Sequence, residues 1–536
     1  MSDPILDRKV PPPPDYYRDN LLRVLKHVAS EHGDLLADQE LTFIATFQSV
    51  GIPSQRLYAR LITRKGPWLR QDKLAYREVD ELDAALLELA ANELVELTPE
   101  APAESLLPLF VKAELTELFA LDCPRKDALL TAILSRYPDP LIRERLLRVS
   151  PWLAITHRRS LSVVQLLFFG DSHRDLSAFV LEDLGMVRYE MYSVSRERRL
   201  FENRQALTRY LRLRDLSNLS HRVGEYPSIA PAILERVVAG GEGCNRLEQR
   251  VRQRTLNRLG RWFERWHAID TALDCYGWAD QPPARERRVR LLTKLGDAFG
   301  ANALLDEIRA NPDTPEEEDF GERFGHRGGG VKPPTTICEL SGAVVDDIEG
   351  HAIRHLASLG GEGWHLENAL PLGLTALAFW DVIFAPVEGA FLNPYQTGPV
   401  DLYWQDFANI RAEEIAVQTD RLSDSRAFEA ELKATWQAKF GVANQLMSWR
   451  HIDDYLLERV LETVPHELLL RLVCHVIQNL ASRRTGFPDL LVLYGTSEYE
   501  FVEVKGPTDQ LQPTQRMWFK YLLGHGYRAR VMKFKA

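Results

Sequence analysis

Cysteine is scarce in this chain of 536 residues, which has five cysteines at widely spaced positions. No two of them form the C-x2-C pair that is typical of zinc and redox sites. A disulfide scaffold would need a paired set, so we expect reduced, mostly buried thiols in a cytoplasmic protein. The five are Cys123, Cys244, Cys275, Cys338 and Cys474.

The chain also lacks a surplus of basic residues. Its formal net charge is −10 and its isoelectric point lies near 5.9. This acidic balance excludes a protein whose whole surface attracts nucleic acid or anionic lipid. Any nucleic-acid site must therefore be a local basic patch.

Several catalytic and targeting motifs are absent. The glycine-rich segments lack the lysine and the serine or threonine of a phosphate-binding loop, and there is no Gly-x-Ser-x-Gly elbow. The first residues contain no basic region followed by an apolar stretch, so we expect no secretory signal. Residues 369–387 approach membrane-spanning length, but Asp381 in their middle favours a buried core helix. The histidines without ligand-like neighbours in the sequence, which we expect to be solvated or ordinary core residues, include His355, His365 and His475.

Composition divides the chain into segments. A hydrophobic content of 45% over this length predicts two to four domains. Helical periodicity dominates as far as residue 310, and a stretch rich in proline, acids and glycine follows. We therefore expect mostly helical N-terminal and central regions and an α/β domain at the end. The segments are an N-terminal helical domain (1–95), a small helical module (96–150), a helical-repeat region (151–310), a linker (311–336) and the α/β domain (337–536).

Two arginine clusters stand out in the central region. From Arg196 to Arg214 there are seven arginines against two acids, and from Arg246 to Arg265 there are again seven against two. Such clusters are more often solvated helix faces, but in an acidic protein they favour phosphate contact. Arginines spaced four apart form one stripe on a helix, and those in the second cluster are Arg246, Arg250, Arg254 and Arg258.

A second basic patch lies in RLYARLITRKGPWL (56–69), where basic and aromatic residues alternate. Backbone contacts and stacking on bases or sugars combine in such a patch. We therefore predict DNA contacts by Tyr58, Arg60, Arg64, Lys65 and Trp68 here, and by Arg250, Arg254 and Arg258 in the stripe.

The segment FPDLLVLYGTSEYEFVEVK (487–505) contains two strand-forming runs around a polar turn. A hairpin centred near Thr496 places Asp489 opposite Glu503, with β-carbons about 5 Å apart, and Lys505 next on the same face. Two carboxylates this close repel each other, and a divalent cation such as Mg²⁺ or Mn²⁺ removes the conflict. A neighbouring lysine can orient water or neutralise phosphate charge, and Gln515 on the following helix can reach back toward the site. The pattern suits metal-assisted phosphodiester hydrolysis, although solvated strand ends would also explain it.

The motifs GFPDLLVLY, EFVEVKGPTDQL and TQRMW resemble the VRR-NUC branch of the PD-(D/E)xK nucleases. Together with FWDVIFAPVEGAFLNPYQTGPVDLY (379–403) and the basic patch, they resemble the Fanconi-associated nucleases in a bacterial version. The resemblance spans most of the chain. It is specific in the last 200 residues and weak in the central helices.

The resemblance implies a structure-specific DNA endonuclease and 5′ to 3′ exonuclease that acts on 5′ flaps and branched DNA in interstrand-crosslink repair. It implies a SAP-like DNA-binding module at 96–150, TPR-like helices at 151–310 and a VRR-NUC nuclease domain at 337–536. A bacterial protein of this kind would lie in the cytoplasm and act at the nucleoid.

The same resemblance implies roles for the site residues. Asp489 and Glu503 would be metal ligands, the Val504 carbonyl a further ligand and Lys505 the catalytic lysine. The family also uses an upstream glutamate, for which Glu367 and Glu362 are the candidates. Glu367 is favoured because of its spacing from Trp380, whereas the GGEG motif around Glu362 occurs twice in the chain.

Two other interpretations remain open. One is a noncatalytic DNA-binding scaffold with a nuclease-like fold, against which the intact Asp489, Glu503 and Lys505 argue. The other is a helical-repeat module that binds proteins and has no nucleic-acid role.

Overall fold

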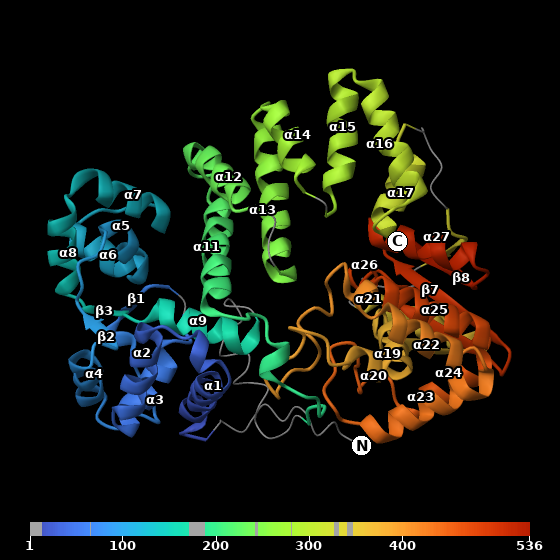
Figure 1. Ribbon diagram of the computed structural model, residues 1–536, viewed down its shortest axis with the longest axis horizontal. Helices are drawn as coiled ribbons and strands as arrows, with labels where there is room; N and C mark the ends of the chain where they lie inside the picture. Colours follow the sequence, from blue (N-terminus) through green and yellow to red (C-terminus); the bar gives the residue numbers. More distant parts are fainter. Residues whose placement is uncertain are drawn as a thin grey trace. The chain divides into compact units, whose positions relative to one another are not determined.

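The computed structural model of the chain describes residues 13–64, 66–170, 188–241, 245–279, 281–325, 332–339 and 347–535. Their contacts group them into two compact units. The first contains the chain up to residue 187 together with 194–197, and the second contains 188–193 and 198–536. Figure 1 shows the helices and strands of both units.

The first unit is built on helices that bury one apolar face each. In α1, Val24, Leu25 and Val28 are fully buried at helical spacing, and α1 packs against α3 and α9. β1, β3 and β2 form an antiparallel sheet in that order. The elements are α1 (Tyr16–His32), α2 (Asp38–Ser49), α3 (Ile52–Leu61), β1 (Trp68–Arg70), α4 (Leu82–Ala91), β2 (Val95–Leu97), β3 (Trp152–Ile155) and α9 (Arg158–Phe169).

Between β2 and β3 the chain forms a small helical bundle with its own core, which includes Leu106, Phe110 and Leu115. Its helices are α5 (Ala103–Leu106), α6 (Lys112–Phe119), α7 (Lys126–Arg136) and α8 (Asp139–Leu147). β3 and α9 then return to the N-terminal helices. Residues 152–169 thus belong to the first unit, whereas our segmentation placed them in the central region.

Helices of the second unit follow one another as packed neighbours, from α11 to α17 (Figure 1). Asn203 and Asn245 cap α11 and α13 with their side-chain oxygens. A β-carbon at Gly260 would lie 2.8 Å from the Tyr276 ring, so this glycine permits the close approach of α13 and α14. The helices are α11 (Arg204–His221), α12 (Ala230–Ala239), α13 (Arg246–Arg265), α14 (Ile269–Gly277), α15 (Ala284–Leu295), α16 (Ala298–Ala310) and α17 (Pro315–Arg323).

Helix α17 lies in the range 311–336 that we predicted to be a linker. Thr314 caps it, and Phe320 packs in a small core with Ile308. Arg285 on α15 donates a hydrogen bond to Glu317 at 3.0 Å. This part of the range therefore folds onto the helical array.

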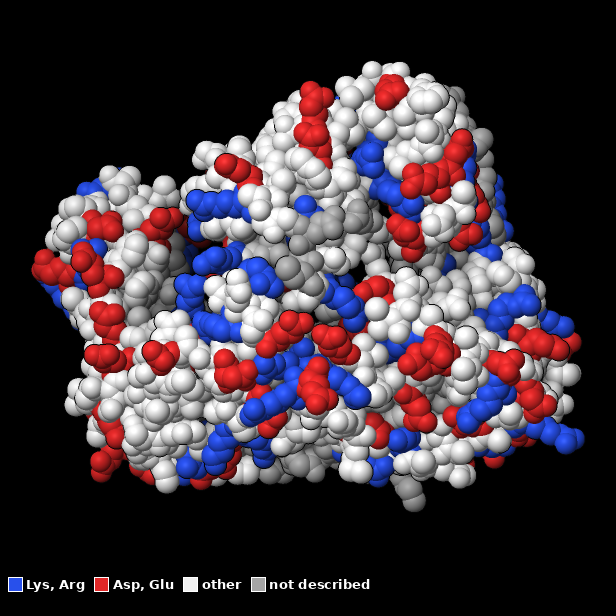
Figure 2. Space-filling model, in the orientation of Figure 1, with Lys and Arg blue, Asp and Glu red and all other residues white. Residues whose placement is uncertain are grey.

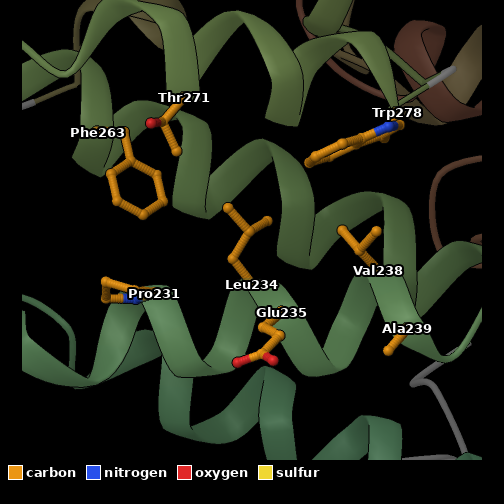
Figure 3. A pocket seen from close by; sticks show the side chains of 8 residues that line it. All are labelled: Pro231, Leu234, Glu235, Val238, Ala239, Phe263, Thr271 and Trp278. Atoms are coloured by element: carbon orange, nitrogen blue, oxygen red, sulfur yellow. The ribbon is translucent and has the colours of Figure 1, made fainter.

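A pocket of about 530 Å³ opens between α12, α13 and α14 (Figure 3). Leu234, Phe263 and Trp278 form much of its wall, and Glu235 is the sole titratable side chain among the described residues that line it. The lining is therefore suited to apolar contact and not to acid–base or metal chemistry.

A mixed sheet organises the C-terminal part of the second unit, with strand order β4-β8-β7-β6-β5. β4, β8 and β7 are parallel, whereas β6 is antiparallel to β7 and β5. Helix α18 covers one face, and the larger core lies on the other. The strands are β4 (Thr335–Glu339), β5 (Glu362–His365), β6 (Leu490–Tyr494), β7 (Glu498–Lys505) and β8 (Ala529–Lys535).

The helices around this sheet include the apolar segment 369–387, which forms α19 and α20 in the core as expected. No helix in the described part of the chain is both long and apolar enough to cross a membrane. The helices are α18 (Ile348–Ser358), α19 (Ala369–Ala378), α20 (Trp380–Ile383), α21 (Phe407–Ile410), α22 (Ala412–Arg421), α23 (Ser425–Lys439), α24 (Asp454–Thr463), α25 (His466–Gln478), α26 (Leu480–Arg483) and α27 (Pro513–Gly524).

Candidate active site

The β6–β7 hairpin has the register that its turn predicts. Leu490 pairs with Val502, so the predicted register is confirmed, and continuing it by one residue sets Asp489, which precedes β6, opposite Glu503. Asp489 Oδ2 accepts a hydrogen bond from the Val504 amide at 2.8 Å. Lys505 Nζ lies 2.6 Å from Glu503 Oε1. The two carboxylates and the lysine therefore meet at one end of the sheet.

Glu503 is a buried acid that its surroundings only partly neutralise. Its side chain is 0% exposed, and Oε2 has no hydrogen-bond partner among the described residues. Burial, followed by the charge of Asp489, raises the pKa of Glu503 to about 7. The pKa of Asp489 is also raised, chiefly by burial. A cation at this point would satisfy the free oxygen and favour both ionised forms.

Glu367 comes to the same place from β5. The amides of Leu366 and Glu367 both donate to the Asp489 carbonyl at 3.0 Å. Glu367 has φ +44°, a left-handed conformation that is uncommon for a residue with a side chain, and these two bonds hold it there. The carboxylates of Glu367 and Asp489 have ligand atoms within 4.8 Å of each other.

Glu362, the other candidate, lies at the opposite end of β5. It pairs with Leu493, roughly 10 Å along the strand from His365 at about 3.3 Å per residue. Its carboxylate accepts a hydrogen bond from the Tyr455 hydroxyl at 2.8 Å and contacts Arg459 at 3.4 Å. The structure therefore places Glu367, and not Glu362, beside Asp489.

Gln515 reaches the site from the first turn of α27. Its side-chain nitrogen donates to Glu503 Oε1, and its side-chain oxygen accepts from the Gln512 amide at 2.8 Å. Lys505 and Gln515 thus share one oxygen of Glu503 and leave Oε2 available. The reach of Gln515 that we predicted is confirmed.

His365 belongs to this group, although its neighbours in the sequence indicated no ligand role. Its Nε2 lies 3.3 Å from Glu367 Oε1, and with Glu367 and Asp489 it forms a set of ligand atoms within 4.8 Å of one another. The spacing His-x-Glu at a strand end was the available signal. Glu349, in the first turn of α18, adds further negative charge near Asp489.

These residues fit a divalent cation. They offer several carboxylate oxygens close together, and Glu503 Oε2 is buried without a partner among the described residues. Hard oxygen donors of this kind suit Mg²⁺ or Mn²⁺. Asp489, Glu503, Glu367 and the Val504 carbonyl are the groups that would hold the ion.

The predicted DNA contacts in the first unit differ in accessibility. Tyr58 is 0% exposed in the core with Phe43 and Phe47, so the prediction that it stacks on DNA is wrong. Arg60 lies over the Tyr17 and Tyr76 rings, 4.1 and 5.0 Å from their centroids.

The remaining residues of that patch are also placed by the fold. The Arg64 side chain bonds the Tyr76 hydroxyl at 2.6 Å and the Lys73 carbonyl at 3.0 Å. Trp68 packs against the core of the small helical bundle. Lys65 lies outside the described residues.

The arginine stripe forms on α13 as its spacing predicts, but much of it faces other parts of the second unit. Arg246 pairs with Asp401 at 3.1 Å, and Arg246 and Arg250 both lie 5.1 Å from the Trp404 ring centroid. Burial lowers the pKa of Arg250 to about 10.

Arg258, farther along α13, donates to the Ser220 hydroxyl at 2.6 Å and to the Ser217 carbonyl at 3.2 Å on α11. DNA contact by Arg250, Arg254 and Arg258 stays a prediction. On the face shown in Figure 2, Lys and Arg side chains gather around α11, whereas acidic and basic side chains alternate elsewhere.

Comparisons with known proteins show the family of the chain. Two family models match, the VRR-NUC domain over residues 424–536 and the FAN1 HTH domain over residues 15–96. A Fanconi-associated nuclease 1 homolog of Pseudomonas aeruginosa is 31% identical over 540 residues, covering 95% of this chain and 94% of the relative. Human Fanconi-associated nuclease 1 is 23% identical over 96% of this chain and 62% of the human protein.

A solved structure, paFAN1 bound to 5′-flap DNA with a 2-nucleotide flap and a gap, matches with a TM-score of 0.81 and 28% identity. The match covers 98% of this chain and 99% of paFAN1. The fold and the site define a nuclease with a VRR-NUC domain C-terminal to a mostly helical region, as predicted. The chain belongs to the Fanconi-associated nuclease family.

Proposed function

We propose that this protein is a divalent-metal-dependent DNA endonuclease and 5′ to 3′ exonuclease that acts on 5′ flaps and branched DNA in interstrand-crosslink repair. The observation that carries the proposal is the buried Glu503 Oε2, which has no hydrogen-bond partner among the described residues and belongs to a side chain near the charge of Asp489. The flap substrate is supported by paFAN1, whose solved structures contain 5′-flap DNA.

The site residues have different roles in hydrolysis. Asp489, Glu503, Glu367 and the Val504 carbonyl would hold Mg²⁺ or Mn²⁺. When bound, the cation supplies Lewis acidity at a phosphate oxygen and activates water. Gln515 fixes the orientation of Glu503 through a hydrogen bond.

Lys505 has the role of a positively charged group beside the reacting phosphate. Its Nζ is 2.6 Å from Glu503 Oε1 and its side chain is 12% exposed. In a site of this burial, the positively charged Lys505 stabilises the negative charge that develops as the phosphodiester bond breaks. Lys505 also orients the attacking water.

We further propose that Arg60, Arg64, Lys65 and Trp68 contact the DNA backbone, together with Arg254 on α13. Such contacts suit a nuclease that reads the shape of a branch and not its sequence. The proposed setting is the bacterial cytoplasm, at the nucleoid during repair.

A matched pair of glutamate variants tests the site. Glu367→Gln should lower cleavage of a 5′-flap duplex in Mn²⁺ by about 10²-fold or more, because it removes a carboxylate from the cation. Glu362→Gln, at the first residue of β5, should cut within about twofold of the wild type. The measurement is single-turnover cleavage with equal DNA occupancy. Equal rates for both variants, or DNA binding without any cleavage by the wild type, would contradict the proposal, and the latter would favour a noncatalytic scaffold.

A further inference from the structure

His365 lies in the candidate site but has no role in the hydrolysis described above. It is the last residue of β5, and it pairs with Leu490, the residue after Asp489. Its side chain is 42% exposed, and its Nε2 is 3.3 Å from Glu367 Oε1. The ligand atoms of His365, Glu367 and Asp489 all lie within 4.8 Å of one another. An imidazole therefore accompanies two of the proposed carboxylate ligands.

The separation between His365 and Glu367 is similar to that between two ligands of a single cation. Two ligands at adjacent octahedral positions, each about 2.1 Å from the metal, lie roughly 3 Å apart. The 3.3 Å between His365 Nε2 and Glu367 Oε1 is close to this value. A side-chain adjustment of a few tenths of an ångström would place both atoms on one ion.

A second observation shows that the neighbourhood is short of positive charge. Glu503, which faces Asp489 across the hairpin, is 0% exposed, and its Oε2 has no hydrogen-bond partner among the described residues. Glu349 adds negative charge near Asp489. A metal ion held from the His365 side as well as by the carboxylates would compensate this charge.

A nitrogen ligand changes which cation the site prefers. Mg²⁺ binds hard oxygen donors and retains its water, whereas imidazole suits transition metals. A site made of oxygen ligands alone discriminates little between Mg²⁺ and Mn²⁺. A site with one imidazole is expected to favour Mn²⁺.

We propose that His365 is a nitrogen ligand of the cation at this site and that it makes the site prefer Mn²⁺ to Mg²⁺. The inference rests on the proposed function, because it adds a ligand to the same cation. The competing role is a hydrogen bond from Nε2 that positions Glu367 without contact to the metal.

Pulsed electron paramagnetic resonance of bound Mn²⁺ tests the ligand directly, because a coordinated imidazole nitrogen modulates the electron spin echo. The sample is the full chain without affinity tags and with one equivalent of Mn²⁺. We expect ¹⁴N modulation in the wild type and its loss in His365→Asn. The matched control is His355→Asn, which changes an exposed histidine on α18 and should retain the modulation.

Metal titrations by calorimetry give the second readout. His365→Asn should bind Mn²⁺ about tenfold more weakly or worse, with a change of less than about threefold for Mg²⁺. Absence of ¹⁴N modulation in the wild type, or wild-type Mn²⁺ affinity in His365→Asn, would overturn the proposal. Equal weakening of both metals without ¹⁴N modulation would also overturn it and assign His365 to positioning Glu367.

Parallel cleavage assays separate this inference from the proposed function. If the wild type shows ¹⁴N modulation but cuts no DNA in either metal, the nuclease proposal fails while the ligand assignment stands. If the wild type cuts 5′-flap DNA but shows no ¹⁴N modulation, the nuclease proposal stands and His365 is not a ligand.

Discussion

The second unit contains two clusters of like charge, the carboxylates at the end of the sheet and the arginines of α13. The two clusters differ in how well neighbouring groups compensate their charge. At the sheet end, Glu503 is buried and Asp489 is half-buried. Lys505 pairs with one oxygen of Glu503, but Oε2 has no partner among the described residues. Along α13, two of the arginines are matched by polar groups: Arg246 by Asp401 and Arg258 by Ser220.

This difference distinguishes a charge cluster that marks a functional site from one that only serves packing. An uncompensated buried charge costs several kcal/mol, so a fold that retains one gains something other than stability from it. A matched charge needs no such explanation, because its partners offset its desolvation. By this criterion the carboxylates indicate a cation site, whereas Arg246 and Arg258 serve the packing of α13.

The largest effect is expected for Asp489→Asn, which keeps the size of the side chain and removes its charge. Cleavage of a 5′-flap duplex in Mn²⁺ should fall by about 10³-fold or more, with DNA affinity changed less than about threefold. The control Glu500→Gln, on the same hairpin but paired with Arg530, should retain activity. Asp489→Asn activity within tenfold of the wild type would show that the carboxylates are not the catalytic cluster.

A smaller loss is expected for Lys505→Met. The fixed cation beside Glu503 is lost, so kcat should fall by about 10²-fold to 10³-fold while KM for DNA changes little. Lys520→Met, which removes a lysine that pairs with Glu322 on α17, is the matched control. A rise in KM with kcat unchanged would assign Lys505 to DNA binding instead.

His475 is a third case, a basic side chain whose burial favours its neutral form. Burial lowers the pKa of His475 to about 3, below its ordinary 6.5. The neutral form is favoured in the folded state, so this contribution to stability is present above pH 6.5 and is lost as pH falls toward 3. Between pH 7.5 and 5 the wild type should lose roughly 2 kcal/mol more stability than His475→Phe. Denaturant unfolding at both pH values measures this, and parallel losses would contradict it.

The smallest effect is expected for Arg258→Ala. Its bonds to Ser220 and Ser217 would be lost, which should lower the free energy of unfolding by about 1–2 kcal/mol. The slope of log DNA affinity against log salt should stay unchanged if this arginine serves packing alone. A slope smaller by about one would show that Arg258 also contacts a phosphate.

The sequence predicted the hairpin of the site well because its register depends on local information. A polar turn between two strand-forming runs fixes which residues oppose each other, and Asp489, Glu503 and Lys505 lie within one such hairpin. Gln515 was reachable by the same reasoning, since its helix follows β7 directly.

Contacts between distant segments were not predictable in this way. His365 approaches Asp489 only because β5 pairs with β6 across more than a hundred residues, and the left-handed turn at Glu367 has no sequence pattern that marks it. Tyr58 was assigned to the surface because it lies among arginines, but its position on α3 points it at Phe43 and Phe47. The partners of the α13 arginines lie on α11 and near Trp404, which spacing along α13 does not reveal.

The backbone conformation at Glu367 lowers the stability of the protein, whereas the side chain at this position serves the proposed activity. Its left-handed conformation costs roughly 1 kcal/mol for a residue with a side chain, and glycine adopts it without that cost. Selection for thermal stability alone would therefore accept glycine at position 367. This change would yield a more stable protein with a damaged site, so a screen for stable variants of this protein must also select for cleavage.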